Sequence, residues 1–163
     1  MAGSSGTKRT ELYDRPSFLL SQLGFHSARR FTELLVPLEV HPRQYGMLRR
    51  LAASDGQSQQ QLAAAMGIHR NVMVSLVDEL ERRGLVRRGR HPTDRRAHAV
   101  LLTSAGRRLL VRAEQIASEH NAELLDPLDS ADQDTLASLL QRIVDGAGLA
   151  RGVHPGLQAP PPQ

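Results

Sequence analysis

The chain of 163 residues has no cysteine and no tryptophan, and aromatic residues make up only 3% of it. Without cysteine, a disulfide scaffold, a cysteine-ligated zinc or iron–sulfur site and thiol redox sensing are excluded. No apolar run approaches the roughly 18 residues of a membrane span, and we expect no membrane association. The first ten residues are polar and lack the apolar segment of a secretory signal. We therefore expect a cytoplasmic protein.

Lysine is also scarce, because twenty of the 21 basic residues are arginine. The distribution of charge is more informative than its total. Residues 66–112 hold eleven arginines and four acids, whereas residues 114–145 hold eight acids and one arginine. The balance is +7 in the first segment and −7 in the second. A basic middle beside an acidic end indicates that one surface meets a polyanion and another does not.

Apolar spacing predicts helices over about 14–37, 41–54, 58–66, 69–83, 103–125 and 130–146. Asp14 is the expected N-cap of the first helix. Ser58 and Gln61 form a capping box at the third, and Ser130 with Gln133 is expected to do the same at the sixth. The first of these helices is long and apolar on more than one side, whereas the sixth has apolar residues along one face. That pattern suits a dimer better than a small monomer.

Between the fourth and fifth helices the hydrophobic period changes. Residues 85–88 and 98–102 are short strand candidates, and residues 89–96 form a polar, turn-rich tip. The predicted fold is mainly α with a small β-hairpin wing: a winged helix–turn–helix over about 42–103, with long helices at both ends. Residues 1–12 and the Pro/Gly-rich residues 147–163 are expected to be a disordered arm and tail around one domain, 13–146.

The fourth predicted helix is the candidate recognition helix, because the second helix of such a pair enters the DNA major groove. Its apolar positions leave a set of residues facing outward, with Val72 at the boundary. An arginine pairs bidentately with guanine and an asparagine with adenine. The alternative is that Arg70 and Asn71 only form a solvated first turn. The predicted contact set is His69, Arg70, Asn71, Val72, Val74 and Ser75, with Ser58 and Gln59 as phosphate contacts.

The tip of the predicted hairpin carries guanidinium groups, which suit the negative potential of a narrow minor groove. The candidate wing residues are Arg90, Asp94, Arg95 and Arg96. Asp94 makes little sense as a DNA contact, but it can hold an arginine in a set direction. The alternative is a charged, solvated loop.

At this point the sequence resembles a known family. Residues 84–88, 94–97 and 102–106 resemble the wing signature of the MarR family of bacterial transcription regulators. Residues 42–48 resemble its second helix, and residues 62–68 and 77–84 resemble its helix–turn–helix. The likeness covers about residues 15–146.

This resemblance implies a winged-helix homodimer on a pseudo-palindromic operator in double-stranded DNA. The helices at about 14–37 and 104–146 would form the dimer, and two recognition helices would sit in successive major grooves. It implies that Arg96 enters the minor groove and that Asp94 orients it. Val72 and Val74 replace the threonines frequent in the family, and valine can still contact thymine methyl groups.

The resemblance also implies a cleft for a small, often anionic aromatic ligand between the dimerisation helices and the winged lobe. Ligand binding would disfavour the DNA-competent spacing of the two lobes. The residues that could line this cleft are His26, Arg29, Arg30, Tyr45 and Arg49. The alternatives are that His26 is a core histidine and that the two arginines are solvated or pair across the dimer.

Two rival functions follow from the same sequence. A metal-responsive regulator would use Glu39 with His41, or Glu119, His120 and Glu123, which lie at helical spacings. A winged helix can also dock protein rather than DNA. No nucleophile elbow, P-loop, Gly-rich dinucleotide turn or zinc-protease motif is present, so we expect no enzyme, no cofactor and no metal site. The wing arginines and the basic middle favour a dimeric DNA-binding repressor released by a ligand.

Overall fold

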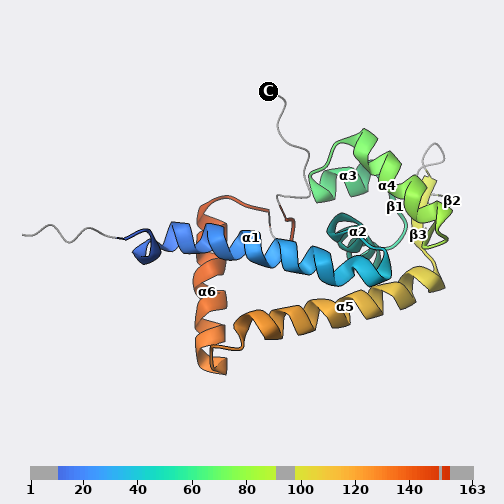
Figure 1. Ribbon diagram of the computed structural model, residues 1–163. Coiled ribbons are helices and arrows are strands. Elements are labelled where there is room, and N and C mark those ends of the chain that lie inside the picture. Colours follow the sequence, from blue (N-terminus) through green and yellow to red (C-terminus); the bar gives the residue numbers. More distant parts are fainter. Residues whose placement is uncertain (1–10, 91–97, 151, 155–163) are drawn as a thin grey trace, which may run out of the picture.

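The computed structural model describes residues 11–90, 98–150 and 152–154. In this part the chain is mainly helical, with one small sheet (Figure 1). The helices are α1 (Pro16–Leu35), α2 (Pro42–Ala53), α3 (Gln59–Met66), α4 (Arg70–Arg82), α5 (Ser104–Leu125) and α6 (Ser130–Gly146); the strands are β1 (Gln57–Ser58), β2 (Val86–Arg90) and β3 (His98–Leu102); and two short 3-10 helices are η1 (Leu12–Asp14) and η2 (Val36–Leu38). The predicted winged helix–turn–helix is therefore confirmed.

Several helices begin at a residue whose side chain accepts a hydrogen bond from the first turn. Ser58 and Gln61 form the predicted capping box at α3, and the Thr103 hydroxyl accepts the amide of Gly106 at 3.0 Å to begin α5. The prediction of Asp14 as a cap is wrong, because Arg15 is the N-cap of α1 and Asp14 lies in η1. Pro16 fixes this start, since the first helical position needs no N–H.

The start of α6 is also one residue from the predicted position. Asp129 is its N-cap and accepts the amide of Asp132 at 2.9 Å. Gln133 completes no capping box with Ser130. Instead it donates to the carbonyls of Leu125 and Leu128, which closes the turn between α5 and α6. A carboxylate at the cap also favours the positive end of the helix dipole.

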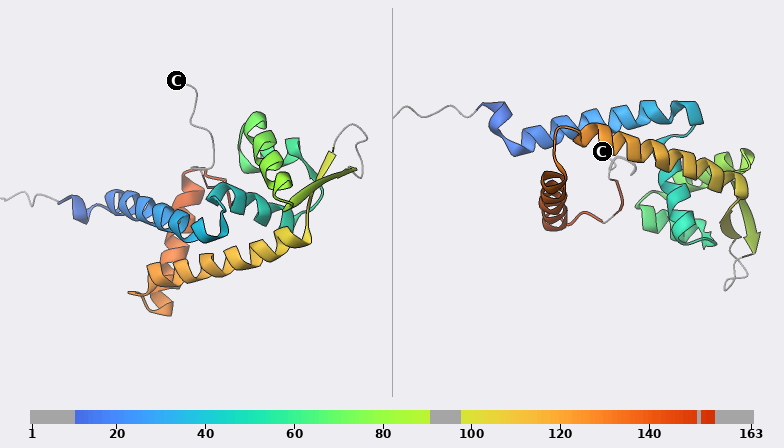
Figure 2. Two further views of the ribbon diagram at one scale, coloured as in Figure 1. Left: turned by 45° about the vertical axis from the view of Figure 1, so that its right-hand side comes forward. Right: turned by 90° about the horizontal axis from the view of Figure 1, so that it is seen from below.

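The sheet has a third strand that the sequence pattern did not predict. Its order is β1-β3-β2, with both pairs antiparallel. The short β1 pairs Gln57 with Val100, and β2 pairs Val86 with Leu102. Figure 2 shows β2 and β3 projecting together from the lobe as a hairpin. The strand β1 thus ties the residue before α3 to the base of this hairpin.

The hydrophobic core belongs mostly to the winged lobe. Helices α2, α3 and α4 and the sheet supply most of its fully buried side chains, which include Met47, Leu48, Leu51, Leu62, Met73, Val77, Leu80, Val86 and Val100. In α3 the buried side chains are Leu62, Ala63 and Met66, whereas Ala65 is half-buried. By contrast, the only buried side chain of α1 is Leu35, and α6 has none.

The long helices extend away from this lobe and leave apolar side chains in solvent. In every view α1 and α5 run beside each other, and α6 lies at their end far from the sheet (Figures 1 and 2). The exposed large apolar residues on these three helices are Phe18, Leu20, Leu23, Phe25, Val111, Leu139 and Ile143. No helix in the described part is long and apolar enough to cross a membrane.

The base of α5 is fixed to the winged lobe by polar contacts. The Asp55 carboxylate accepts the amide of Leu102 at 2.9 Å and pairs with the guanidinium of Arg107 at 2.9 Å. Gly106 lies so close to the loop before β2 that a Cβ there would sit 2.1 Å from the carbonyl oxygen of Leu85. The orientation of the lobe therefore follows the direction of α5.

Candidate DNA interface and ligand cleft

The helix–turn–helix is formed by α3 and α4 with a short turn between them. Gly67 ends α3 in the left-handed region, at φ +63°, where glycine carries no steric penalty. The amide of Ile68 then returns to the carbonyl of Ala63 at 3.0 Å. His69 is the N-cap of α4 and its Nδ1 accepts the amide of Asn71 at 3.2 Å. These bonds define where α4, the candidate recognition helix, begins.

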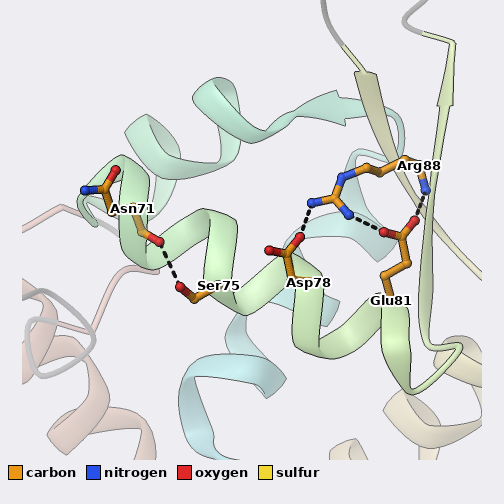
Figure 3. A network of polar contacts seen from close by, with 5 residues as sticks. All are labelled: Asn71, Ser75, Asp78, Glu81 and Arg88. Atoms are coloured by element: carbon orange, nitrogen blue, oxygen red, sulfur yellow. Dashed lines mark hydrogen bonds and ion pairs between the residues drawn. The ribbon is translucent and has the colours of Figure 1, made fainter.

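The first turn of α4 presents polar side chains to solvent, as predicted. His69, Arg70, Asn71 and Ser75 are exposed. The Ser75 hydroxyl donates to the backbone carbonyl of Asn71 at 3.2 Å, and the side-chain amide of Asn71 points away from the helix (Figure 3). Val74 is half-buried, so it lies at the boundary with Val72 and not in the fully exposed set.

The start of α3 is less open than predicted. The Ser58 hydroxyl accepts the amide of Gln61 at 3.2 Å and is engaged as a cap. The side-chain nitrogen of Gln59 is buried and has no hydrogen-bond partner among the described residues. Phosphate contacts by these two residues stay a prediction.

A charged network that sequence reasoning missed joins α4 to the wing. The guanidinium of Arg88 on β2 pairs with Asp78 and Glu81 on α4, and Glu81 also accepts the backbone amide of Arg88 at 2.8 Å (Figure 3). Burial lowers the pKa of Arg88, but its hydrogen bonds to the two carboxylates outweigh this and leave the pKa above its usual value. The single positive charge of Arg88 therefore offsets one of the two negative charges on the helix that would face DNA.

The wing itself is described up to its tip. Arg90 ends β2, is exposed, and pairs in register with His98. Asp94, Arg95 and Arg96 lie outside the described residues, so the structure does not place the predicted minor-groove contact.

A second candidate site is a cleft of about 760 Å³ between α1, α2 and α5. Two of the predicted ligand residues, Tyr45 and Arg49, line it, but the other three do not. His26 is exposed on α1 and lies neither in the core nor in the cleft. Arg29 pairs with Glu33 along the same helix, and Arg30 pairs with Glu123 of α5 at 3.3 Å. The lining residues are Gly24, Ser27, Ala28, Phe31, Thr32, His41, Pro42, Tyr45, Gly46, Arg49, Arg50, Ala117, His120, Asn121, Leu124, Gly152 and His154.

The inner wall of this cleft is aromatic. Phe31 meets Tyr45 edge-on with centroids 5.4 Å apart, and it stacks on His120 at 5.8 Å. Arg49 lies over the Tyr45 ring and pairs with Glu114 at 2.8 Å. Burial raises the pKa of the Tyr45 hydroxyl; Arg49 opposes this rise and Glu114 adds to it. Among the described residues, the lining holds two arginines and three histidines but no carboxylate, which suits an anionic ligand with an aromatic ring.

The predicted metal ligands are not brought together. His120 points inward and its Nε2 lies 3.0 Å from the Ser27 hydroxyl, whereas Glu119 accepts from Gln115 and Glu123 pairs with Arg30. Across residues 11–90, 98–150 and 152–154, no three histidine or carboxylate side chains converge as metal ligands.

Comparisons with known proteins decide the family. The model of the MarR family matches residues 38–97 of this chain. A protein of Thauera aromatica assigned to transcriptional regulation of the hcr operon is 35% identical over 133 residues, which are 77% of this chain and 80% of that protein. This chain belongs to the MarR family. It is a transcription regulator with a winged helix–turn–helix, and MarR-family members are regulators rather than enzymes.

Two solved structures of MarR-like regulators show what related proteins bind. The repressor CouR bound to a 23-mer DNA duplex is 34% identical, with a TM-score of 0.73 over 86% of this chain and 99% of that one. CouR of Rhodococcus jostii RHA1 bound to p-coumaroyl-CoA is 33% identical, with a TM-score of 0.68 over 82% of this chain and 94% of that one.

Proposed function

We propose that this MarR-family chain is a homodimeric repressor in the cytoplasm that binds a pseudo-palindromic operator and is released by an aromatic, anionic ligand. The observation that carries the proposal is the exposed first turn of α4, where His69, Arg70 and Asn71 stand free of the core. Their donors and acceptors match base edges in the major groove. A relative of similar sequence, CouR, has been solved on DNA.

The homodimer is supported by the apolar surface of the long helices. Phe25 is 74% exposed, Val111 is 70% exposed and Ile143 is 54% exposed, on three different helices. Large apolar side chains exposed in this number are costly in water and suit burial against a second copy. Sedimentation equilibrium at micromolar concentration should give twice the chain mass. Ile143→Arg should shift the protein to monomer, whereas Arg142→Gln, its exposed neighbour, should not.

The ligand is supported by the cleft and by its position. Helices α1 and α5 line the cleft together with α2 of the winged lobe. A ligand held there contacts both parts of the molecule and can change their relative orientation. Because CouR has been solved with p-coumaroyl-CoA, an aromatic acyl thioester of coenzyme A is the ligand class to test first.

Fluorescence anisotropy on DNA tests the proposal. The duplexes are the intergenic sequence upstream of the protein's own gene and a scrambled duplex of the same composition, each titrated over a salt series. Tight binding to the first alone, with an affinity that falls steeply as salt rises, supports the regulator. Addition of p-coumaroyl-CoA should then release the DNA. Absence of binding to either duplex at low salt would contradict DNA recognition and favour protein docking.

A further inference from the structure

The strongest unassigned feature of the cleft is a pair of polar side chains, Ser27 on α1 and His120 on α5. Their Oγ and Nε2 atoms lie 3.0 Å apart, and both residues line the cleft. His120 is only 8% exposed. Polar side chains buried to this degree are normally hydrogen-bonded at every polar atom.

One ring nitrogen of His120 lacks such a partner. Its Nδ1 is buried and has no hydrogen bond to any described residue. An unpaired buried nitrogen costs about 1–3 kcal/mol, and a hydrogen-bonding group brought to it by a ligand would remove that cost. Because Nδ1 is sealed from solvent, a ligand reaches it only after the ring turns over, which exchanges the positions of the nitrogens and carbons and frees the Ser27 hydroxyl.

The surroundings of the pair define the chemistry of that partner. His120 stacks on Phe31, which in turn meets Tyr45, so a group beside the pair lies against aromatic rings. Ser27 and His120 can each donate or accept, depending on the tautomer. A hydroxyl group satisfies either arrangement because it donates and accepts at once, whereas a carboxylate can only accept and would be buried without a cation at this wall. The lining arginines belong to α2.

We propose that Ser27 and His120 recognise a hydroxyl group on the aromatic ring of the ligand, so that the protein selects hydroxylated over unsubstituted aromatic acyl groups. This inference rests on the proposed ligand response. It adds a specificity that the cleft's charge alone does not provide, because the arginines attract any anion of suitable size. A site that hydrogen-bonds a substrate hydroxyl discriminates against the analogue that lacks it, since its own polar atoms are then left unpaired.

Calorimetric titration of the full-length protein in the absence of DNA tests this. The probes are p-coumaroyl-CoA and cinnamoyl-CoA, which differ by one ring hydroxyl. Wild type should bind the hydroxylated thioester about ten-fold more tightly, the factor expected for one net hydrogen bond. His120→Phe keeps a planar ring against Phe31 but removes both nitrogens. This variant should bind the two thioesters about equally. Its affinity for cinnamoyl-CoA should stay within about two-fold of the wild-type value.

Two further variants make the result decisive. Ser27→Ala should also reduce the preference for the hydroxylated thioester. This substitution removes only one hydroxyl group, so we expect the fold to be retained. Glu119→Gln alters the outer face of α5 beside His120 and should keep the ten-fold ratio, since Glu119 contacts Gln115 and not the cleft. Circular dichroism melting confirms that each variant is folded.

Each outcome either supports or overturns the inference. Equal binding of the two thioesters by wild type, or an unchanged preference in both His120→Phe and Ser27→Ala, overturns the hydroxyl recognition and leaves the ligand response intact. Failure of the wild-type protein to bind either thioester overturns both the proposed ligand class and this inference. The DNA titration tests separately whether the protein binds its operator.

Discussion

Glu81 on α4 accepts two hydrogen bonds from Arg88 on β2, one from the backbone amide and one from the guanidinium. The same guanidinium also holds Asp78. The contact fixes the angle between α4 and β2, which carry the two predicted groove contacts. The positive charge of Arg88 also reduces the repulsion that the two carboxylates would otherwise exert on phosphate.

Arg88→Met should therefore lower operator affinity about ten-fold without unfolding the protein. The wing loses its fixed angle, and Asp78, which is 58% exposed, is left as a free carboxylate near the DNA backbone. Anisotropy on the operator measures the change. Adding Asp78→Asn to Arg88→Met should recover part of the loss. Glu79→Gln, which removes an exposed charge of the same helix outside the network, is the matched control, and an equal effect in both would contradict the argument.

Asn71→Ala should relax base preference more than it lowers affinity for scrambled DNA. The Asn71 side-chain amide is exposed and points away from the helix, so it is available for a bidentate contact with adenine. We expect a loss of about 1–3 kcal/mol in the difference between operator and scrambled duplex. Binding to a set of single-base operator variants locates the position. An equal loss of affinity for all sequences would mean that Asn71 contacts the DNA backbone and positions the protein instead of reading a base.

Arg96→Ala should weaken binding to every duplex and reduce the slope of affinity against salt by about one unit, as loss of one cationic contact requires. This prediction comes from the sequence, since Arg96 lies outside the described residues. The far-ultraviolet circular dichroism spectrum and melting temperature should be unchanged, because a wing tip is not part of the core. Unfolding of this variant would contradict its assignment to the tip.

Local signals in the sequence predicted the elements of the winged lobe well. The Ser58–Gln61 capping box and the positive-φ glycines 67 and 84 are short-range signals. The hydrogen bonds that go with them join residues close together in the sequence. The strand β1 escaped prediction because it is two residues long and exists only through pairing with Val100, more than forty residues later. The contacts of Arg88 with α4 are likewise set by how the wing packs.

The ligand cleft was predicted only in part, and the two histidines explain why. His26 lies on a helix with apolar residues on several sides, so its direction could not be read from spacing, and the structure exposes it. His120 follows Leu110 and Ala113 along the buried stripe of α5, a spacing that would have placed it inward. Its bond to Ser27 joins two helices that are distant in sequence, and no local pattern indicates it.

Gly106→Ala should strongly destabilise the protein, because the added Cβ would sit 2.1 Å from the Leu85 carbonyl oxygen and 2.7 Å from a methyl carbon of Leu102. The Leu85 backbone can move away from this carbon only if β2 moves relative to α5. We expect a loss of more than about 2 kcal/mol in the free energy of unfolding, measured by urea denaturation at fixed protein concentration.

The matched control is Gly24→Ala on α1, where nothing lies within 4 Å of the added carbon. It should raise the free energy of unfolding by about 0.5–1 kcal/mol, since alanine is the better helix former. A Gly106→Ala protein as stable as wild type would mean that α5 can shift at its base. The lobe would then not follow the direction of α5, and a ligand in the cleft would have to release DNA by another route.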